Sequence, residues 1–491
     1  MTAGSQPVAQ RPPIRRPEPG GYDRDTVLVG GEWRPARSDE RLAVQDSSTE
    51  ETLGAIRSGS GEDVDAAVAA ARAALPGWAA TPPAARAGQL RALAAALECR
   101  ADELTALISA EVGTAVRMCA AIQVASSLRL IGLSADLLTA EPLEEQFGNS
   151  LVVQRPVGVV AAITPWNYPL FQTVAKVAAA IAAGCTVVHK PSELAPLSSF
   201  VLAEAAQAAL PAGVYNLVPG TGPVVGEAMA THPGVAMVSF TGSTVAGTRV
   251  YELAARSIKR VALELGGKSA SVILDDADLP GAVQATVNRA FLNSGQTCDA
   301  WTRLLVPRAR LDDALDLAVA SAQRLTLGDP FDRGTKLGPL ISARQLNRVR
   351  GFVEEALADG ASAPAGGPTP PDGFERGHYF RPTVLANVQP SMRVAREEVF
   401  GPVLAVLTFD SEEEAVRIAN DTQYGLSGAV WSADQERALE FARQMDAGQV
   451  VINGGAFNPL APFGGVKQSG IGREQGVYGI REFLVPVALQ S

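Results

Sequence analysis

VGVVAAITPWNYPLFQTVAKVAAAIAAGCTVVHKPSE, residues 157–193, is the stretch that decides the fold. Continuous apolar runs at 157–163 and 185–189 predict two buried strands, and the Ala-rich residues 171–183 between them predict a helix. Strands that are apolar throughout and are joined by a helix are typical of a parallel sheet with both faces covered. In such α/β sheets, ligands bind beyond the carboxyl ends of the strands.

The same alternation of strands and helices extends along most of the chain. Around this unit, further strands are expected at 151–153, 214–218, 235–240 and 261–265, and helices at 196–209, 222–232 and 243–255. A second α/β region follows, with strands at 269–274 and 303–306 and helices at 279–292, 311–325, 342–358 and 411–420. The N-terminal part has strand-like pieces at 26–29 and 42–44 and helical spacing over 62–78, 86–108 and 116–138. Residues 359–377 are rich in Pro, Gly and Ala and predict a surface loop. Residues 483–489 predict a free edge strand, and because such edges are usually covered or paired, this strand favours an oligomer.

Composition and charge exclude several classes of protein. The chain has 491 residues with a formal net charge of −10, so its surface repels phosphate backbones and argues against nucleic-acid binding. The longest apolar stretch, 173–188, is too short to span a membrane comfortably and is interrupted by Lys176 and Gly184. Residues 1–22 contain Arg and Pro but no apolar segment, so they predict a disordered tail and not a secretory signal. A cytoplasmic protein is expected.

The cysteines indicate a reducing compartment and no metal site. Cys99, Cys119, Cys185 and Cys298 form no C-x-x-C pair, and the three histidines have no zinc-ligand spacing. Four cysteines in so long a chain make no disulfide framework. Taken alone, each fits a buried, reduced thiol.

Three residues have the chemistry and the placement of catalytic groups. Cys298 follows the small residues Ser294 and Gly295, and it would act as a nucleophile only as the thiolate. Glu264 ends an apolar strand, where desolvation would make its carboxylate a useful base; a salt bridge to Lys268 is the structural alternative. Asn167 follows a strand, so its amide is placed either to donate to an oxyanion or to cap a turn.

Two further turns have the residues that hold a nucleotide. Lys190 and Glu193 follow a strand, where they can hold the two hydroxyls of a ribose or form a loop ion pair. A carboxylate there repels a ribose phosphate and favours NAD over NADP. The strand-to-helix turn FTGST at 240–244 suits a pyrophosphate, although a plain helix cap explains it equally well.

Together, seven segments resemble the aldehyde dehydrogenase family. In chain order they are PWNYPL (165–170), KPSE (190–193), FTGST (240–244), LELGGK (263–268), NSGQTC (293–298), EEVFGP (397–402) and PFGGVKQSGIGRE (462–474). The resemblance implies the aldehyde dehydrogenase-like α/β fold, with a Rossmann-like coenzyme domain, an α/β catalytic domain and a small β oligomerisation extension. The implied boundaries are 1–22 for the tail, 23–132 and 152–266 for the coenzyme domain, 267–463 for the catalytic domain, and 133–151 and 480–491 for the oligomerisation segment.

The same resemblance implies the reaction and the residues that carry it. The reaction is NAD-dependent oxidation of an aldehyde to a carboxylic acid, with NADP possible, through a thiohemiacetal and a thioester on the nucleophile. It assigns Cys298 as nucleophile, Glu264 as general base, Asn167 as oxyanion donor, and Lys176 and Glu474 to proton exit. The implied cofactor residues are Thr164, Pro165, Trp166, Lys190, Ser192, Glu193, Phe240, Gly242, Ser243, Leu265, Gly266, Glu398 and Phe400. Val245 departs from the pattern, since many family members carry Glu there.

Substrate and assembly are less sharply defined by the resemblance. The implied pocket residues are Tyr168, Gln172, Ala175, Thr297, Asp299, Phe457 and Phe463. The small Ala175 and the aromatic side chains favour a roomy pocket for an apolar or aromatic aldehyde, whereas Asp299 and Gln172 favour an amino-aldehyde. No arginine is evident for the carboxylate of a semialdehyde. A homodimer or homotetramer is implied. A coenzyme-A-acylating member, which would lack the Glu base, and a non-catalytic member remain the alternatives.

Overall fold

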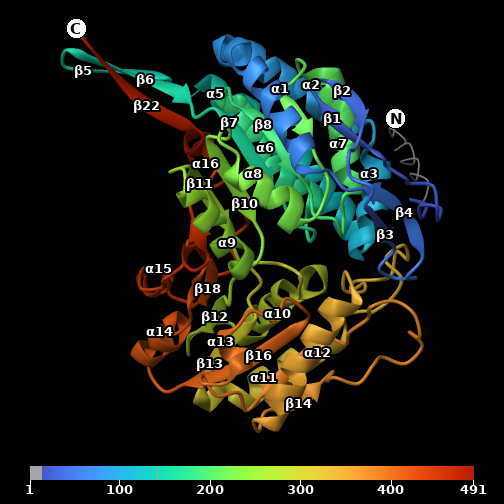
Figure 1. Ribbon diagram of the computed structural model, residues 1–491. Helices are drawn as coiled ribbons and strands as arrows, with labels where there is room; N and C mark the ends of the chain where they lie inside the picture. The colour runs from blue at the N-terminus through green and yellow to red at the C-terminus, as the bar shows by residue number, and fades with distance from the viewer. Residues whose placement is uncertain (1–13, 141) are drawn as a thin grey trace, which may run out of the picture.

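Two sheets, each covered by helices on both faces, form the two lobes of the protein (Figure 1). The structure is a computed structural model and describes residues 14–140 and 142–491. The first sheet contains, in spatial order, β2 (Glu32–Pro35), β1 (Thr26–Val29), β9 (Tyr215–Leu217), β8 (Thr186–Lys190), β7 (Val159–Ile163), β10 (Met237–Thr241), β11 (Arg260–Glu264) and β21 (Gly470–Ile471). The five strands from β9 to β11 are parallel, as the sequence predicts.

Alternate residues of β7 pack on opposite faces of this sheet. Val159, Ala161 and Ile163 contact one cluster and Val160 and Ala162 the other. The first cluster is completed by α1 (Gly61–Ala80), α8 (Glu227–Thr231) and α9 (Thr244–Ala255). The second is completed by α2 (Pro83–Glu98), α3 (Ala101–Val112), α5 (Ala125–Ala140), α6 (Pro169–Ala183), α7 (Leu197–Ala209) and α16 (Gly476–Glu482). Because both faces are buried, the strands are apolar throughout.

The second sheet has seven strands. In spatial order they are β14 (Ser362–Ala365), β15 (Thr383–Ala386), β16 (Val403–Phe409), β13 (Arg303–Pro307), β12 (Ala270–Ile273), β18 (Ser427–Trp431) and β19 (Gln449–Ile452). All neighbours are parallel except β14 and β15. Its helices are α10 (Leu279–Ala290) and α11 (Leu311–Gln323) on one face, and α12 (Ala343–Ala358), α13 (Arg393–Arg396), α14 (Glu412–Asn420) and α15 (Gln435–Arg443) on the other. The α/β fold predicted from the sequence is confirmed.

A three-stranded sheet projects from the first lobe (Figure 1). It contains β22 (Leu484–Gln490), β6 (Ser150–Pro156) and β5 (Glu144–Phe147), with β6 in the middle. The C-terminal strand β22 pairs antiparallel with β6 from Leu484–Pro156 to Gln490–Ser150, and its other edge has no partner strand among the described residues. Smaller pairs are β3 (Arg41–Gln45) with β4 (Thr52–Arg57), and β17 (Tyr424–Gly425) with β20 (Val466–Lys467).

The structure differs from the sequence expectations at several local points. The helical spacing at 86–108 is shared by two helices, α2 and α3, because the backbone leaves helical geometry at Arg100 while the apolar spacing continues. The predicted loop at 359–377 contains the short strand β14, which pairs with β15 although its sequence is Ser-Ala-Pro-Ala. The predicted boundary at 133 lies inside α5, whose buried Leu138 belongs to the core of the first lobe.

Residues 14–22 of the predicted tail pack against the folded body. Arg16 forms ion pairs with Asp46 and Asp329, and its guanidinium lies 4.5 Å from the centre of the Phe331 ring. Tyr22 donates a backbone hydrogen bond to the carbonyl of Leu53 at 3.1 Å. The expectation of a disordered tail is therefore wrong for residues 14–22, and residues 1–13 lie outside the described residues.

One helix in the described part of the chain is long and apolar enough to cross a membrane by length and composition alone. It spans Val116–Ala140 and comprises α4 (Val116–Met118), the π-helical segment η1 (Cys119–Val124) and α5. Ile131, Ala135 and Leu138 of this helix are buried in the core of the first lobe. Core helices commonly meet the same criteria.

Candidate active site

Cys298 is presented by a left-handed turn after α10. Asn293, Ser294 and Gly295 have successive φ values of 53°, 56° and 72°, which lie in the left-handed region that residues other than glycine rarely adopt. Ser294 Oγ donates to the carbonyl of Gly338 at 2.8 Å, which helps to hold the turn. Cys119 and Cys185 are fully buried, whereas Cys298 retains partial exposure. Strain of this kind persists only where the surroundings fix it, and it is common at functional sites.

Asn167 lies against this turn. It sits between β7 and α6, and its side-chain Nδ2 donates to the carbonyl of Gln296 at 3.0 Å, two residues before Cys298. The neighbouring Tyr168 hydroxyl lies 2.8 Å from Thr297 Oγ1. The structure therefore brings the carboxyl end of β7 in the first lobe to the cysteine turn of the second, as the sequence motifs require.

A buried polar cluster that the sequence did not reveal supports Asn167 from behind. Asn293 Nδ2 donates to the backbone carbonyl of Asn167 at 3.0 Å, and Gln123 Nε2 donates to the same carbonyl at 3.3 Å. Thr114 Oγ1 donates to Asn293 Oδ1 at 2.6 Å and accepts from Gln123 Nε2 at 2.8 Å. Gln123 lies in η1, and π-helical turns of this kind are frequent at functional sites. Gln123 can be assigned to this cluster only from the buried position of its helix, which is known only once the fold is known.

A second buried network holds the two ends of the Asn167 turn. His189, fully buried in β8, places Nδ1 2.7 Å from the Tyr215 hydroxyl and Nε2 2.9 Å from Thr164 Oγ1. Thr164 Oγ1 lies 3.1 Å from Thr173 Oγ1, which donates to the carbonyl of Pro169 at 2.7 Å. Thr164 precedes the turn and Pro169 follows it.

Thr173 Oγ1 is the donor to Thr164 Oγ1 as well as to the Pro169 carbonyl. His189 joins this pair to Tyr215 through its two ring nitrogens, one of which donates and the other accepts in a neutral imidazole. Burial lowers the pKa of His189 to about 3, and the Lys190 charge adds to this, so the imidazole is neutral.

Glu264 is the last residue of β11, and its side chain is buried without a partner. Neither carboxylate oxygen accepts a hydrogen bond from any described residue, and the alternative salt bridge to Lys268 does not form. Burial raises the pKa of Glu264 well above its usual range, Glu474 raises it further, and Lys176 opposes the shift. An unpaired buried carboxylate of raised pKa has the properties of a general base.

Lys176 and Glu474 form a buried ion pair beside Glu264. Their side chains are 1% and 7% exposed. Glu474 is held by a two-way backbone contact in which its N–H donates to the carbonyl of Phe463 at 2.7 Å and its carbonyl accepts from the Phe463 N–H at 2.8 Å. The charges that act on Glu264 thus come from α6 and from the C-terminal motif.

Several surroundings keep the Cys298 thiol protonated in the free protein. Burial raises its pKa well above the usual value, and the nearby carboxylates of Asp299, Glu398 and Glu264 raise it further. The positive charge of Arg289 opposes them. A base must therefore take the thiol proton before the sulfur can act as a nucleophile.

The EEVFGP segment packs directly against the cysteine turn. A Cβ added at Gly295 would lie 2.2 Å from the backbone of Gly401, so the two segments are in direct backbone contact. Phe400 has a φ of 62°, and its ring meets Trp166 edge-on with centroids 5.3 Å apart. Glu398 Oε1 accepts from the Gly267 N–H at 3.1 Å, and burial raises the pKa of Glu398 to about 7.

The PFGGVKQSGIGRE segment wraps around the end of β11. Ser469 Oγ donates to the carbonyl of Gly266 at 2.6 Å, and the Leu265 N–H donates to the carbonyl of Ser469 at 2.9 Å. Gly464, with a φ of 152°, has room for no side chain, because a Cβ there would lie 2.7 Å from Glu264 Oε1. Glycine is needed at this position because the backbone passes so close to the buried carboxylate.

The predicted cofactor residues lie at the carboxyl edge of the first sheet. Lys190 Nζ donates to the carbonyls of Pro191 and Gly220 and lies 3.8 Å from the Glu193 carboxylate. Ser243 is the N-cap of α9, which is the alternative that the sequence left open for the FTGST turn. The N-terminus of α9 points to the same edge. Among the remaining predicted residues of this set, Phe240 lies in β10. The others follow β7, β8, β10 or β11: Thr164, Pro165, Trp166, Ser192, Gly242, Leu265 and Gly266.

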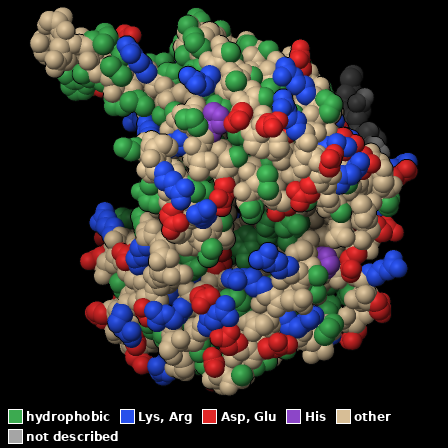
Figure 2. Space-filling view, in the orientation of Figure 1, with side chains coloured by type: hydrophobic (Ala, Val, Ile, Leu, Met, Phe, Trp, Pro, Cys, Tyr) green, Lys and Arg blue, Asp and Glu red, His purple; other side chains and the backbone are tan. Residues whose placement is uncertain are grey.

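The space between the lobes is hollowed. Figure 2 shows a recess with a hydrophobic floor and with Lys and Arg side chains at its lower rim. Leu194 follows β8, Val224 lies in the π-helical turn η2 (Gly222–Gly226) after β9, and Val245 lies in the first turn of α9 after β10. Their apolar side chains are 39%, 45% and 83% exposed.

The predicted substrate residues are only partly brought together. Six of them are buried: Tyr168, Gln172, Ala175, Thr297, Asp299 and Phe463. Phe457 is 51% exposed on a loop, and no contact of its ring supports its assignment to the pocket. Gln172 Oε1 accepts from Thr241 Oγ1 at 3.5 Å. The sequence missed Arg289, which forms an ion pair with Asp299.

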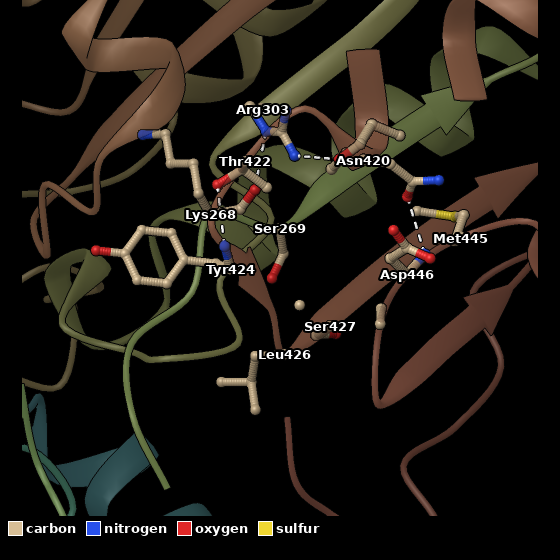
Figure 3. Close-up of a pocket in the computed structure, with 14 residues that line it drawn as sticks. Lys268, Ser269, Arg303, Asn420, Thr422, Tyr424, Leu426, Ser427, Met445 and Asp446 are labelled. Carbon is tan, nitrogen blue, oxygen red and sulfur yellow. Dashed lines mark hydrogen bonds between the residues drawn. The ribbon is translucent and has the colours of Figure 1, made fainter. Parts of the chain in front are cut away.

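A separate small cavity lies behind the LELGGK segment (Figure 3). Its volume is about 10 Å³, room for one water, and Lys268, Arg303 and Asp446 are among its walls. Lys268 runs away from the other lining residues in Figure 3, and its Nζ has no hydrogen-bond partner among the described residues. Burial lowers the pKa of Lys268 to about 7. The cavity is too small for an organic substrate.

Comparison with known proteins identifies the class. Residues 33–488 match the model of the aldehyde dehydrogenase family. A 3-succinoylsemialdehyde-pyridine dehydrogenase from Pseudomonas sp is 46% identical over 94% of this chain and 97% of its own length. The chain belongs to the aldehyde dehydrogenase family.

Solved structures agree in fold. A mutant of aldehyde dehydrogenase C from Pseudomonas syringae, complexed with NAD⁺ and octanal, superposes with a TM-score of 0.94 at 46% identity, covering 95% of this chain and 96% of that one. Betaine aldehyde dehydrogenase from Staphylococcus aureus, in complex with NAD⁺, has a TM-score of 0.92 at 36% identity, covering 95% and 94%.

Removing the Tyr215 hydroxyl tests the network behind Asn167. Tyr215→Phe leaves His189 Nδ1 without its hydrogen-bond partner, which frees the imidazole to change tautomer and loosens the turn. We expect kcat to fall by about 3- to 10-fold with little change in the KM for the coenzyme, and stability to fall by about 1 kcal/mol. Steady-state kinetics and thermal unfolding measure both.

Tyr478→Phe, at a half-exposed tyrosine, is the matched control. If Tyr215→Phe lowers stability and leaves kcat at the wild-type value, the network serves folding alone.

Adding one methyl group at Gly464 tests the placement of Glu264. Gly464→Ala puts a Cβ against Glu264 Oε1 and moves the carboxylate. We expect steady-state turnover to fall by about 10- to 100-fold, while the first turnover is less affected because it precedes the hydrolysis step. Rapid-mixing kinetics separate the two phases.

Gly455→Ala, where the added Cβ meets only the Ile452 carbonyl at 3.4 Å, is the control and should retain activity. Equal loss in both phases would contradict a specific effect on Glu264.

Proposed function

We propose that this protein oxidises an aldehyde to a carboxylic acid, with Cys298 as the nucleophile and NAD as the hydride acceptor. The observation that carries the proposal is the meeting of three groups: the Asn167 amide bonded to the carbonyl of Gln296, Cys298 on the same turn, and a buried unpaired Glu264. Each supplies one requirement of acyl chemistry at a carbonyl carbon.

The residues of the first lobe fit NAD. The N-terminus of α9 and Ser243 suit the negative pyrophosphate, and the exposed Leu194, Val224 and Val245 suit the flat adenine. Lys190 and Glu193 are placed for one ribose and Glu398 for the other, while Phe400 packs near the nicotinamide. When bound, NAD would accept a hydride from the substrate carbon.

The first chemical steps use the cysteine turn. The Cys298 thiol loses its proton to a base, and the sulfur forms a bond to the aldehyde carbon while the carbonyl oxygen becomes an alkoxide. The Asn167 amide and the Cys298 N–H donate to that oxygen. When the alkoxide re-forms the carbonyl, the C–H bond breaks with its electron pair and a thioester remains on Cys298.

Hydrolysis of the thioester uses Glu264. Its carboxylate takes a proton from water, whose oxygen bonds to the acyl carbon, and the C–S bond then breaks to release the acid. Lys176 and Glu474 would carry the proton out, since their ion pair lies beside Glu264. The presence of this base favours hydrolysis over transfer to coenzyme A, and the assembled site favours an enzyme over a non-catalytic relative.

The substrate we propose is an apolar or aromatic aldehyde. Tyr168, Ala175 and Phe463 supply apolar surface, and octanal is bound in the Pseudomonas syringae structure. Among the alternatives, a semialdehyde is favoured by the name of the Pseudomonas relative, and the amino-aldehyde by Asp299 and Gln172.

We also propose a homodimer or homotetramer in the cytoplasm. The open edge of β22, with Leu489 43% exposed, and Phe147 of β5, 56% exposed, offer a strand edge and apolar surface for a second copy. With the first boundary moved past the end of α5, residues 23–140 and 152–266 then form the coenzyme domain and 267–463 the catalytic domain, with the three-stranded sheet joining the subunits.

Removing the Glu264 charge separates hydride transfer from hydrolysis. We expect Glu264→Gln to give a burst of about one NADH per active site, followed by a steady rate at least about 100-fold below wild type. Rapid mixing with octanal and NAD measures both phases. Cys298→Ala should give neither, and an unchanged steady rate in Glu264→Gln would exclude Glu264 as the base.

Removing the Glu193 charge tests coenzyme choice. A carboxylate at the ribose repels the additional phosphate of NADP, so the wild type should prefer NAD. Glu193→Ala should lower the ratio of kcat/KM with NAD to kcat/KM with NADP by about 10-fold. Glu252→Ala, on the exposed surface of α9, is the control. A wild-type preference for NADP would overturn the assignment.

A further inference from the structure

A charged pair lies immediately beside the nucleophile. Arg289, in the last turn of α10, forms an ion pair with Asp299, the residue that follows Cys298. Gln449 Nε2 also approaches Asp299 Oδ2, at 3.4 Å. Asp299 is therefore held by two donors and is not an isolated negative charge.

The two partners are unequally accessible. The Asp299 side chain is 8% exposed, whereas that of Arg289 is 29% exposed. Arg289 Nε has no hydrogen-bond partner among the described residues, and the guanidinium lies 6.0 Å from the centre of the Trp301 ring. The Arg289 side chain is therefore partly accessible, its buried Nε–H donor is unused, and the carboxylate is enclosed.

Arg289 is also close enough to Cys298 and Tyr168 for its charge to act on both. Its charge acts on both Cys298 and Tyr168, opposing the rise in the pKa of each. Tyr168 is bonded to Thr297, so Arg289, Tyr168 and Asp299 gather on one side of the cysteine turn. This placement reverses the expectation that Asp299 favours an amino-aldehyde.

Resting on the proposed function, we propose that Arg289 is a specificity residue that selects aldehydes carrying an oxygen acceptor, a ketone or a carboxylate, beyond the aldehyde carbon, and that it rejects cationic aldehydes. The physical reason is that Arg donates strongly to carbonyl and carboxylate oxygens, whereas a cationic group meets a like charge. Asp299 fixes the guanidinium in place.

Four aldehydes of similar length test the proposal. They are pentanal, 4-oxopentanal, succinic semialdehyde and 4-trimethylammoniobutanal, which carry a methyl group, a ketone, a carboxylate and a cation. With the wild type, we expect kcat/KM to be higher for one or both acceptor-bearing aldehydes than for pentanal, and at least about 10-fold lower for the cation than for pentanal. The ketone and carboxylate arms distinguish the two sources of the acceptor oxygen.

Neutralising Arg289 and neutralising Asp299 should change the selectivity between acceptor-bearing and cationic aldehydes in opposite directions. Arg289→Met leaves Asp299 unpaired, so the ratio of kcat/KM for the acceptor-bearing aldehydes to that for the cation should fall by at least about 100-fold. Asp299→Asn should raise the same ratio, and the double variant should bring it near one. Arg289→Lys keeps the charge and should retain the order of substrates. Arg308→Met, which breaks an exposed ion pair with Asp410, is the control.

Pentanal separates the two levels of the account. If Arg289→Met still oxidises pentanal and its ratio changes by less than about twofold, Arg289 is not a specificity residue. If Arg289→Met is unfolded or inactive with pentanal, Arg289→Lys and Asp299→Asn decide: an unchanged ratio in Asp299→Asn overturns the proposal. If the wild type gives no NADH with any aldehyde, the proposed function itself fails.

Discussion

The backbone contact between Gly295 and Gly401 is the constraint on which the site depends. The left-handed turn at Asn293–Gly295 packs against Gly401, and no side chain at position 295 would fit between the two segments. Asn293 then reaches Asn167 from the other lobe, and Asn167 reaches the carbonyl of Gln296. One close approach between glycines therefore aligns Cys298, Asn167 and the Glu398–Phe400 segment.

The site contains buried titratable side chains that lack hydrogen-bond partners. Glu264 has no hydrogen-bond partner among the described residues, Lys268 Nζ has none either, and both are nearly inaccessible to solvent. Such groups cost stability, and the surrounding glycine-rich segments hold them in place. Fixed polar groups in a desolvated cleft act strongly on charge that develops during a reaction, which is why the same features that lower stability serve catalysis.

Much of this organisation follows from the sequence, and the remainder has identifiable reasons. The apolar run from Val159 to Ile163 predicts its strand because both faces are buried, and the motif around Cys298 predicts the nucleophile. Gln123, His189 and Arg289 could not be found in that way, since each acts through a partner distant along the chain. The break at Arg100 was missed because apolar spacing continues through it. The partner of Asp299 could not be predicted either, because the proximity of Arg289 depends on where α10 ends.

The location of the acyl group tests the central claim most directly. The protein would be mixed with octanal and NAD, quenched in acid during the first turnover, digested and examined by mass spectrometry. The account predicts an octanoyl thioester on the peptide that contains Cys298, which accumulates further in Glu264→Gln. NADH formation with no acyl group on Cys298, or with the acyl group on Cys99, would contradict it.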